Sequence, residues 1–368
     1  MARLARADLF APDEIAIVHV MNRVVRRCFL MGNDPVSGRN FDHRKLWVEE
    51  RLRHLAASFG IDLLGFAILS NHFHLILRSR PDVVATWSDT EVARRWLMIC
   101  PLRKRKDGSA EEPTEVELNS ICNNPVRLAQ IRTRLSDFGW WMRLLCQKLA
   151  VRANKEDGEV GKFFQSRYRA VRLCDEEAIL ACSAYVDLNP IRAKLAETLE
   201  ESDFTSVQRR IEGLSESKKS STANQENLSS KTPAATKAFE GSKRDGFLSP
   251  LTIDEFRDAI WADPSPTGLR CSDKGFLPLT TTDYLKLLDW TARQVVSGKR
   301  GSTPDSVPSI LDRLSIKSNT WLELVTQFGK LFNNVAGRPR VIDNTRSRVQ
   351  HRRFNLRREA RELLATES

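Results

Sequence analysis

The chain has 368 residues, 41% of them hydrophobic and 29% charged, which is enough apolar material for two domains or one enlarged domain. The seven cysteines are dispersed and include no C-x-x-C pair, which excludes a disulfide framework or a zinc cluster. The sequence has no signal-peptide stretch and no apolar run near the ~20 residues that span a bilayer, so we expect a cytoplasmic protein that does not bind membranes. The formal net charge of +11 favours a polyanionic partner such as nucleic acid, and a merely solvated basic surface is the alternative.

The apolar periodicity of the first 200 residues predicts alternating strands and helices. The polar Ser70-Asn71 link between two apolar runs favours a hairpin, and Asp175 is placed to cap a helix. The order predicts an α+β domain, in which helices pack on a four-stranded, largely antiparallel sheet. The expected elements are strand 15–22, helix 41–59, strands 63–69 and 72–78, helix 138–155, strand 163–173 and helix 176–188.

The rest of the chain is divided by composition. Proline, glycine and charged clusters break residues 79–136 into short helical pieces, which indicates an insertion within a catalytic domain of residues 1–214. Residues 215–245 are rich in Ser, Lys, Thr and Asn, as is typical of a flexible linker. Residues 246–368 then form a mainly helical C-terminal extension with a basic tail.

A pair of histidines stands in the third expected strand. Side chains two residues apart point to the same face of a strand, so the imidazoles of His72 and His74 can share a divalent ion. An H-x-H pair alone is also compatible with a structural role. A zinc hydrolase needs further ligands, and no H-x-H-x-D-H pattern follows His74. Carboxylates from distant parts of the sequence are the alternative source of such ligands.

One of the three tyrosines lies in a setting suited to nucleophilic chemistry. Tyr185 and Asn189 are four residues apart, so they share a face of the expected helix. A phenol with a pKa near 10 needs a nearby cation to attack phosphorus, and a metal held by the histidines can supply it. The Asn189 carbonyl oxygen is a further hard ligand for such an ion. The alternative is an aromatic ring that only packs against the sheet.

Four segments together resemble a known family, and they occur in family order. They are HVMNR (19–23), SNHFHLIL (70–77), GKFFQSRYRAV (161–171) and AYVDLNPIRAKL (184–195). The set resembles the REP-associated tyrosine transposases, which are insertion-sequence-200-like members of the HUH (His-hydrophobe-His) nuclease superfamily. The resemblance implies a ferredoxin- or RRM-like fold and the cleavage and rejoining of single-stranded or hairpin DNA.

The same resemblance implies roles for individual residues. In that family the strand histidines bind Mg²⁺ or Mn²⁺, and the helix tyrosine forms a 5′-phosphotyrosine from which strands are later rejoined. Carried over, His72 and His74 are metal ligands, Asn189 is the third ligand and Tyr185 is the nucleophile. The chain departs from the family at Val24, where a glycine is usual, in the enlarged segment after the histidine strand, and in the unmatched extension beyond about residue 215.

Basic residues near these motifs are candidates for DNA contacts, although each alone is more often a surface charge. Arg167 and Arg169 are expected on one face of strand 163–173, where they can hold phosphates. The tail, residues 338–361, carries nine arginines and lacks a wide apolar stripe, which favours further phosphate contacts. The candidates are Arg23, Arg167, Arg169, Arg192, Arg352 and Arg353.

Three functions compete on the sequence alone. The leading one is a metal-dependent transposase or nuclease acting through a covalent tyrosine, in a nucleoid-associated protein that could form a homo-oligomer. The second is a catalytically silent DNA-binding regulator derived from such an enzyme. A replication initiator or relaxase ranks lower, because those proteins usually have a larger histidine cluster.

Overall fold

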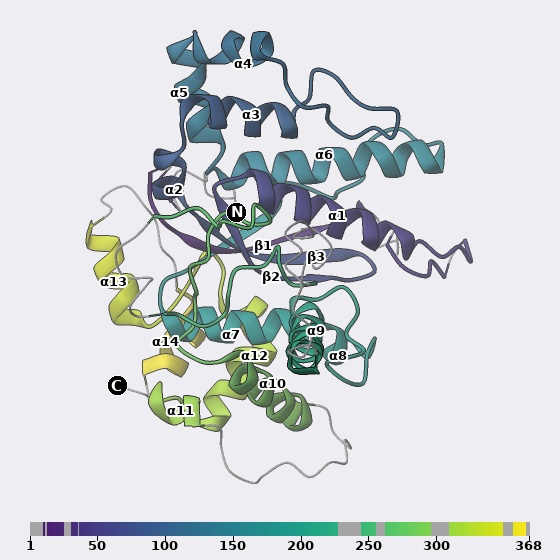
Figure 1. Cartoon of the computed structure of the whole chain (residues 1–368). Coiled ribbons are helices and arrows are strands. Elements are labelled where there is room, and N and C mark those ends of the chain that lie inside the picture. The colour runs from purple at the N-terminus through teal and green to yellow at the C-terminus, as the bar shows by residue number, and fades with distance from the viewer. Residues whose placement is uncertain are drawn as a thin grey trace.

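The computed structural model of the chain describes residues 10–11, 13–25, 31–35, 37–226, 244–254, 262–295, 309–348 and 356–365. It shows one mixed sheet between two layers of helices (Figure 1). No helix in these ranges is both long enough and apolar enough to cross a membrane.

The sheet has the strand order β2-β3-β1-β4-β5. The first four strands pair antiparallel, as expected, whereas β5 pairs parallel to β4. The α+β class is therefore confirmed, and the four-stranded sheet is wrong by one strand. Two residues of the C-terminal region form β5. A strand this short shows no alternation of apolar and polar residues, so the sequence gives no sign of it. The strands are β1 (Ile17–Arg23), β2 (Ile61–Ile68), β3 (His72–Ser79), β4 (Arg169–Leu173) and β5 (Val335–Ala336).

The two faces of the sheet are covered differently because side chains alternate along each strand. Val18, Val20 and Leu75 belong to a core beneath α1 (His43–Ser58) and α6 (Phe138–Asp157). The expected insertion stacks outside that layer as four short helices (Figure 1). They are α2 (Pro81–Thr86), α3 (Asp89–Ile99), α4 (Glu115–Cys122) and α5 (Pro125–Arg134).

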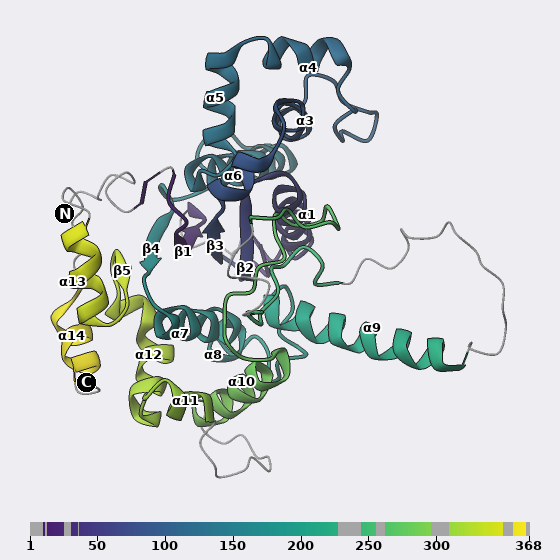
Figure 2. The same cartoon turned by 60° about the vertical axis from the view of Figure 1, so that its left-hand side comes forward.

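The opposite face carries the helix with the candidate nucleophile. The side chain of Asp175 accepts a hydrogen bond from the backbone N–H of Ala178 and caps α7, as the sequence predicts. Helices from the C-terminal region pack around α7 (Figure 2). On this side lie α7 (Glu176–Asp187), α8 (Asn189–Arg192), α9 (Ser206–Glu226), α10 (Thr281–Val295), α11 (Ser309–Arg313), α12 (Ser318–Leu331), α13 (Pro339–Arg348) and α14 (Arg358–Ala365).

Two expected boundaries differ from the structure. Strand 163–173 is shortened to β4, because the residues before Arg169 follow an irregular path along the end of β1, with the Gln165 N–H bonded to the Arg23 carbonyl. The expected linker, 215–245, begins as helix, since α9 continues to Glu226. Serines of this helix return hydrogen bonds to carbonyls one turn earlier, as Ser217 does to Gly213, so their polarity does not interrupt it. Residues 227–243 lie outside the described ranges.

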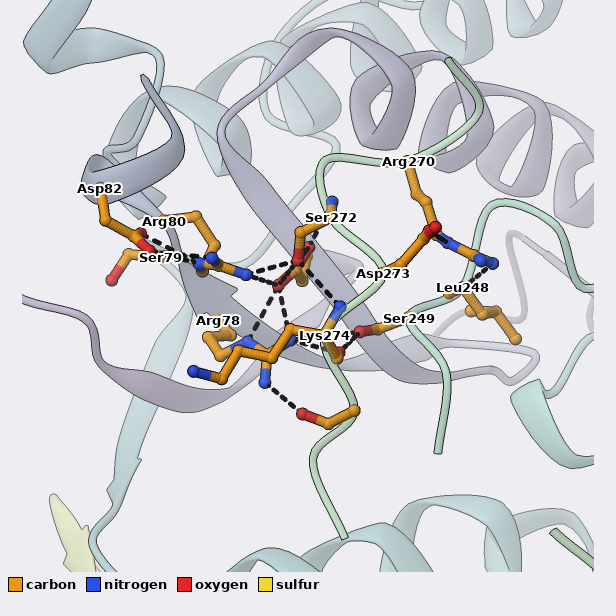
Figure 3. A network of polar contacts seen from close by, with 12 residues as sticks. Arg78, Ser79, Arg80, Asp82, Leu248, Ser249, Arg270, Ser272, Asp273 and Lys274 are labelled. Atoms are coloured by element: carbon orange, nitrogen blue, oxygen red, sulfur yellow. Dashed lines mark hydrogen bonds and ion pairs between the residues drawn. The ribbon is translucent and has the colours of Figure 1, made fainter. Parts of the chain in front are cut away.

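The C-terminal region also contacts the sheet through a buried ionic network (Figure 3). Asp62 of β2 has no exposed surface and accepts a hydrogen bond from Arg78 Nη2 at 2.7 Å. The backbone N–H of Ser272 donates to the same carboxylate at 3.0 Å, and Arg80 bonds to the Ser272 hydroxyl. A buried carboxylate needs such partners, so residues around 272 complete the outer edge of the sheet.

Candidate functional site

Strand β3 and helix α7 place the candidate histidine and tyrosine side chains on the same side of the sheet. His74 points to the face covered by α7, whereas Phe73 and Leu75 are buried beneath α1 and α6. The ring centroid of Tyr185 lies 5.5 Å from that of His74, in an edge-on orientation. Asn189 begins α8, and its Nδ2 lies 3.2 Å from His74 Nε2. Residues that are more than a hundred positions apart in sequence therefore meet at one place.

A further histidine, His19 of β1, lies against His74. The two rings are nearly parallel, with centroids 5.1 Å apart, and His19 Nε2 is 2.8 Å from His74 Nδ1. With the Asn189 amide donating to Nε2, the His74 proton resides on Nδ1 and is donated to His19. His19 thus fixes the orientation of the His74 ring and leaves Nε2 facing the site.

His72 lies at the start of β3, beside His74. Its Nδ1 is 2.6 Å from Asn71 Oδ1, which leaves Nε2 unengaged by that contact, and its cross-strand neighbour on β1 is Arg23. Burial, with the Arg23 charge, lowers the pKa of His72 to about 4. Burial also lowers the pKa of His19 to about 3 and that of His74 well below its ordinary value. All three imidazoles are therefore neutral at pH 7, as ligands and acceptors must be.

Tyr185 is partly buried beside this histidine cluster. Burial raises the pKa of its phenol, and the positive charge of Arg192 opposes that rise. The Arg192 guanidinium lies 4.8 Å from the centre of the Tyr185 ring and hydrogen-bonds to its side chain. The phenol is accordingly protonated at neutral pH, with one cation already next to it.

Two of the predicted DNA-binding arginines contact helix α12. Arg192 Nη2 donates to the Thr326 carbonyl at 2.6 Å. Arg169 Nη1 donates to the Gly329 carbonyl at 3.2 Å, and its Nη2 donates to the Phe332 carbonyl. Both side chains thus lie beside the tyrosine and bind backbone oxygens of the C-terminal region.

The other predicted DNA contacts are distributed differently. Arg23 lies at the His72 end of β1. Arg167 is exposed and precedes β4, so the expectation that it shares a strand face with Arg169 is wrong; the irregular backbone before Arg169 is the reason. Arg352 and Arg353 lie outside the described residues.

Several described arginines of the basic tail form ion pairs within the protein. Arg338 lies 2.9 Å from Glu177 of α7. Arg361 of α14 lies 3.1 Å from Asp343 of α13. Arg338 thus connects the tail to α7, whereas Arg361 connects α14 to α13 within the tail.

Helix α12 covers the tyrosine from the side opposite the sheet. The Phe328 ring lies 5.6 Å from that of Tyr185 and 6.0 Å from that of His19. Gly329 faces the phenol so closely that a Cβ on it would lie 3.1 Å from Tyr185 Oη. Sequence analysis missed His19, Phe328 and Gly329. The position of His19 in HVMNR, four residues before Arg23, is the one available signal, while nothing in the sequence links α12 to the motifs.

The donor set can be tested for its fit to a metal ion. Two ligand atoms in adjacent positions of an octahedral ion at about 2.1 Å lie about 3.0 Å apart. The 3.2 Å between His74 Nε2 and the Asn189 amide is close to this, and a half-turn of that amide presents its oxygen. In the described part of the chain, no three His, Cys, Asp or Glu side chains form a metal-binding group, which gives a zinc hydrolase no support. The spacing of His74 and Asn189 is therefore compatible with two ligands of one octahedral ion, and the ring of His72 lies 5.0 Å from that of His74, centroid to centroid.

Comparison with known proteins identifies one similar solved structure and no similar sequence. No family model and no curated protein sequence matches the chain. One solved structure, of a REP-associated tyrosine transposase bound to a REP hairpin, aligns over 57% of this chain and 86% of its own, with a TM-score of 0.33 and 10% sequence identity. An alignment at that level establishes neither a shared fold nor a shared activity.

Proposed function

We propose that the protein is a metal-dependent nuclease and strand transferase that cleaves and rejoins single-stranded or hairpin DNA through Tyr185. The observation that carries this proposal is the convergence of Tyr185, His74 and Asn189 around one point, with His72 beside them. The four positions are those that the resemblance to the tyrosine transposases assigns to catalysis. The +11 net charge is consistent with a polyanionic substrate.

In this proposal Tyr185 Oη attacks the phosphorus of a phosphodiester. The new Tyr–O–P bond forms as the bond from phosphorus to the 3′-oxygen breaks, which leaves a 5′-phosphotyrosine and a free 3′-OH. The phenol loses its proton and the departing 3′-oxygen gains one. Arg192 stabilises the phenolate because its charge already opposes the rise in the Tyr185 pKa. The reverse attack by a 3′-OH rejoins DNA and releases the tyrosine.

His72, His74 and Asn189 would hold Mg²⁺ or Mn²⁺, which as a Lewis acid polarises the phosphate when bound. Neither imidazole carries a charge, and no carboxylate belongs to the set. Hard divalent ions favour anionic oxygen ligands, so the phosphate of DNA must supply the negative charge. We therefore expect weak metal binding by the free protein and tighter binding in the complex with DNA.

The runner-up is a DNA-binding regulator without catalysis. The partial burial of Tyr185 beneath Phe328 and Gly329 favours it, because helix α12 restricts the approach of a phosphodiester to the phenol. The two functions differ in whether a covalent product forms.

The test is incubation of the full chain with single-stranded hairpin DNA and Mg²⁺ or Mn²⁺, followed by denaturing electrophoresis and peptide mass spectrometry. We expect an adduct on the peptide that contains Tyr185, lost in Tyr185→Phe and in EDTA, while Tyr185→Phe still binds DNA. An adduct on Tyr168, or unchanged cleavage in EDTA, would contradict the proposal. Binding without any adduct would support the regulator.

A further inference from the structure

Basic side chains without an acidic partner gather where the insertion meets α1 and α6, on the side of the sheet opposite α7 (Figure 1). Other basic residues of the same elements are paired. Arg53 of α1 pairs with Glu49. Arg94 of α3 pairs with Glu112. Within the described residues, none of the members of this basic cluster forms an ion pair with a carboxylate. They are Arg51, Lys104, Arg134, Arg143 and Lys148.

Arg51 is a partly buried member of the cluster. Its Nε and Nη2 atoms are both buried, and neither has a hydrogen-bond acceptor in the part of the chain that the structure describes. Burial lowers the pKa of its guanidinium to about 10. Arg78 binds the Asp62 carboxylate through the same two atoms, at 2.9 and 2.7 Å. Because buried donors on a charged group need an acceptor, this edge of Arg51 suits an anion with a forked pair of oxygens.

The charges of the cluster act on one another. Burial raises the pKa of the Cys100 thiol at the end of α3, and four members of the cluster oppose that rise, Arg51 first among them. Partial burial lowers the pKa of Lys148, and the charges of Lys104 and Arg51 lower it further. Cations this close repel one another, and a bound anion removes the repulsion.

Two tryptophans orient the arginines of the insertion side. The guanidinium groups of Arg134 and Arg143 lie 4.6 and 4.8 Å from the centre of the Trp140 ring. The Trp96 ring is edge-on to Trp140, with centroids 5.5 Å apart. Arg134 Nη2 also lies 3.5 Å from Gln130 Oε1, a long contact with a neutral group. A ring holds a guanidinium by its flat face, which leaves the N–H groups in its plane for phosphate oxygens.

We propose that the basic cluster and Trp140 form a second nucleic-acid-binding site, in which Arg51 and its neighbours bind backbone phosphates of single-stranded DNA. Unpaired cations beside an aromatic ring are what single-stranded nucleic acid binds. The site is built in part by the insertion, where the chain departs from the tyrosine transposases. The proposal rests on the proposed function for the choice of DNA as the polyanion, but not on catalysis by Tyr185.

The first measurement is a titration with a labelled single-stranded oligonucleotide at several salt concentrations. One double variant, Arg143→Ala with Lys148→Ala, removes two exposed members of the cluster. The control, Arg94→Ala with Lys286→Ala, removes an exposed arginine and an exposed lysine that already pair with carboxylates. We expect the slope of log K against log salt concentration to become shallower by about 1.4 in the first variant only. The same change in both variants, or in neither, overturns the proposal.

The second measurement locates the DNA on the protein. An oligonucleotide that carries iodouracil is photo-crosslinked, and the crosslinked peptides are identified by mass spectrometry. We expect a crosslink on the peptide that contains Trp140, since this ring is partly exposed beside the cations. The crosslink should weaken in the first double variant and persist in the control. Crosslinks confined to peptides of α7 and α8 would overturn the proposal.

Arg51→Met tests the buried charge itself. Because this guanidinium has two buried atoms without an acceptor, we expect the DNA-free variant to be more stable than the unaltered chain in chemical denaturation. Its affinity for the oligonucleotide should fall. A structural role predicts the reverse, and a less stable variant with unchanged affinity would show that the inference is wrong.

Thermal unfolding at equal ionic strength identifies the source of the phosphate. The oligonucleotide should stabilise the unaltered chain more than the first double variant, whereas inorganic phosphate should affect both equally. If inorganic phosphate alone distinguishes them, the cluster binds a small anion and the assignment to DNA is wrong.

The adduct assay separates this inference from the proposed function. If slope and crosslink change as expected but no variant forms an adduct on Tyr185, the second site stands and the nuclease activity fails. If the adduct forms and the first double variant binds DNA with an unchanged slope, the nuclease activity stands and the second site fails.

Discussion

His19 Nε2 lies 2.8 Å from His74 Nδ1, and the two imidazole rings are nearly parallel. An acceptor at Nδ1 holds the proton there and directs the lone pair of Nε2 toward Asn189. Partners of this kind orient metal-binding histidines and increase their basicity. The relationship connects β1, which holds no expected ligand, to the metal chemistry proposed for β3.

We predict that His19→Phe lowers the affinity for Mn²⁺ about 10- to 100-fold, because the aromatic packing remains while the acceptor is lost. His19→Gln, whose amide oxygen can accept from His74, should restore part of the affinity. The measurement is a Mn²⁺ titration followed by electron paramagnetic resonance, with non-cleavable DNA present. Equal affinity in His19→Phe and the unaltered chain would show that His19 only packs.

Arg169 and Arg192 are predicted to bind phosphate directly. In Arg169→Ala or Arg192→Ala, the slope of log K against log salt concentration should become shallower by about 0.7 for single-stranded DNA. Arg94→Ala is the control, since this exposed side chain pairs with Glu112 in the insertion, away from the tail and the site. Slopes unchanged in the first two variants would remove both arginines from the DNA interface.

Tyr284 provides a control for the role of Tyr185. Its hydroxyl donates to the buried Asp187 carboxylate at 2.7 Å and joins α10 to the end of α7. Tyr284→Phe should lower the free energy of unfolding by about 1.5–3 kcal/mol, because a buried charged acceptor loses one donor. Adduct formation per folded molecule should be retained. Chemical denaturation and the adduct assay together check this, and loss of the adduct in the folded variant would contradict it.

Asp175 should make the stability depend on pH. Burial raises the pKa of its carboxyl to about 6 from an ordinary value of 3.8, although the backbone N–H groups of Arg338 and Ala178 oppose the rise. A raised folded-state pKa means that the folded chain binds the proton more tightly than the unfolded chain. This carboxyl therefore contributes most stability below about pH 4, and the contribution is lost as the pH rises to about 6.

The pH-dependent contribution of Asp175 to the free energy of unfolding cannot exceed about 3 kcal/mol. Asp175→Asn, which keeps a carbonyl oxygen for the α7 cap, should flatten this part of the stability curve. Chemical denaturation between pH 4 and 7 is the measurement, compared with the unaltered chain. The same pH dependence in Asp175→Asn would assign it to other groups.

The sequence predicts well those parts of the fold in which local pattern and packing agree. Periodicity placed β1, β2, β3, α1, α6 and α7 within a few residues, because each element has an apolar face long enough to read. The spacing of Tyr185 and Asn189 led to the region where His74 meets both.

What escaped prediction depends on contacts between distant segments. The two residues of β5 are too few to show a periodic pattern of apolar and polar side chains. The amphipathic pattern of α12 shows which face is buried but not that Gly329 lies on Tyr185. His19 is a single residue whose importance depends on cross-strand register, which places β1 beside β3.

The network around Asp62 has a consequence for the folding of the protein during its synthesis on the ribosome. This carboxylate has no exposed surface, and Ser272, which donates two hydrogen bonds to it, is 210 residues further along the chain. Arg78 and Arg80 lie close enough in sequence to pair with this carboxylate early, but the hydrogen bonds from Ser272 are missing while residue 272 is still untranslated, and a buried carboxylate needs such partners. At about 5–20 residues per second, the emerging N-terminal half waits on the order of ten seconds or more with an incomplete sheet edge. The edge of the sheet at β2 is therefore completed only late in synthesis, by a segment from the C-terminal region.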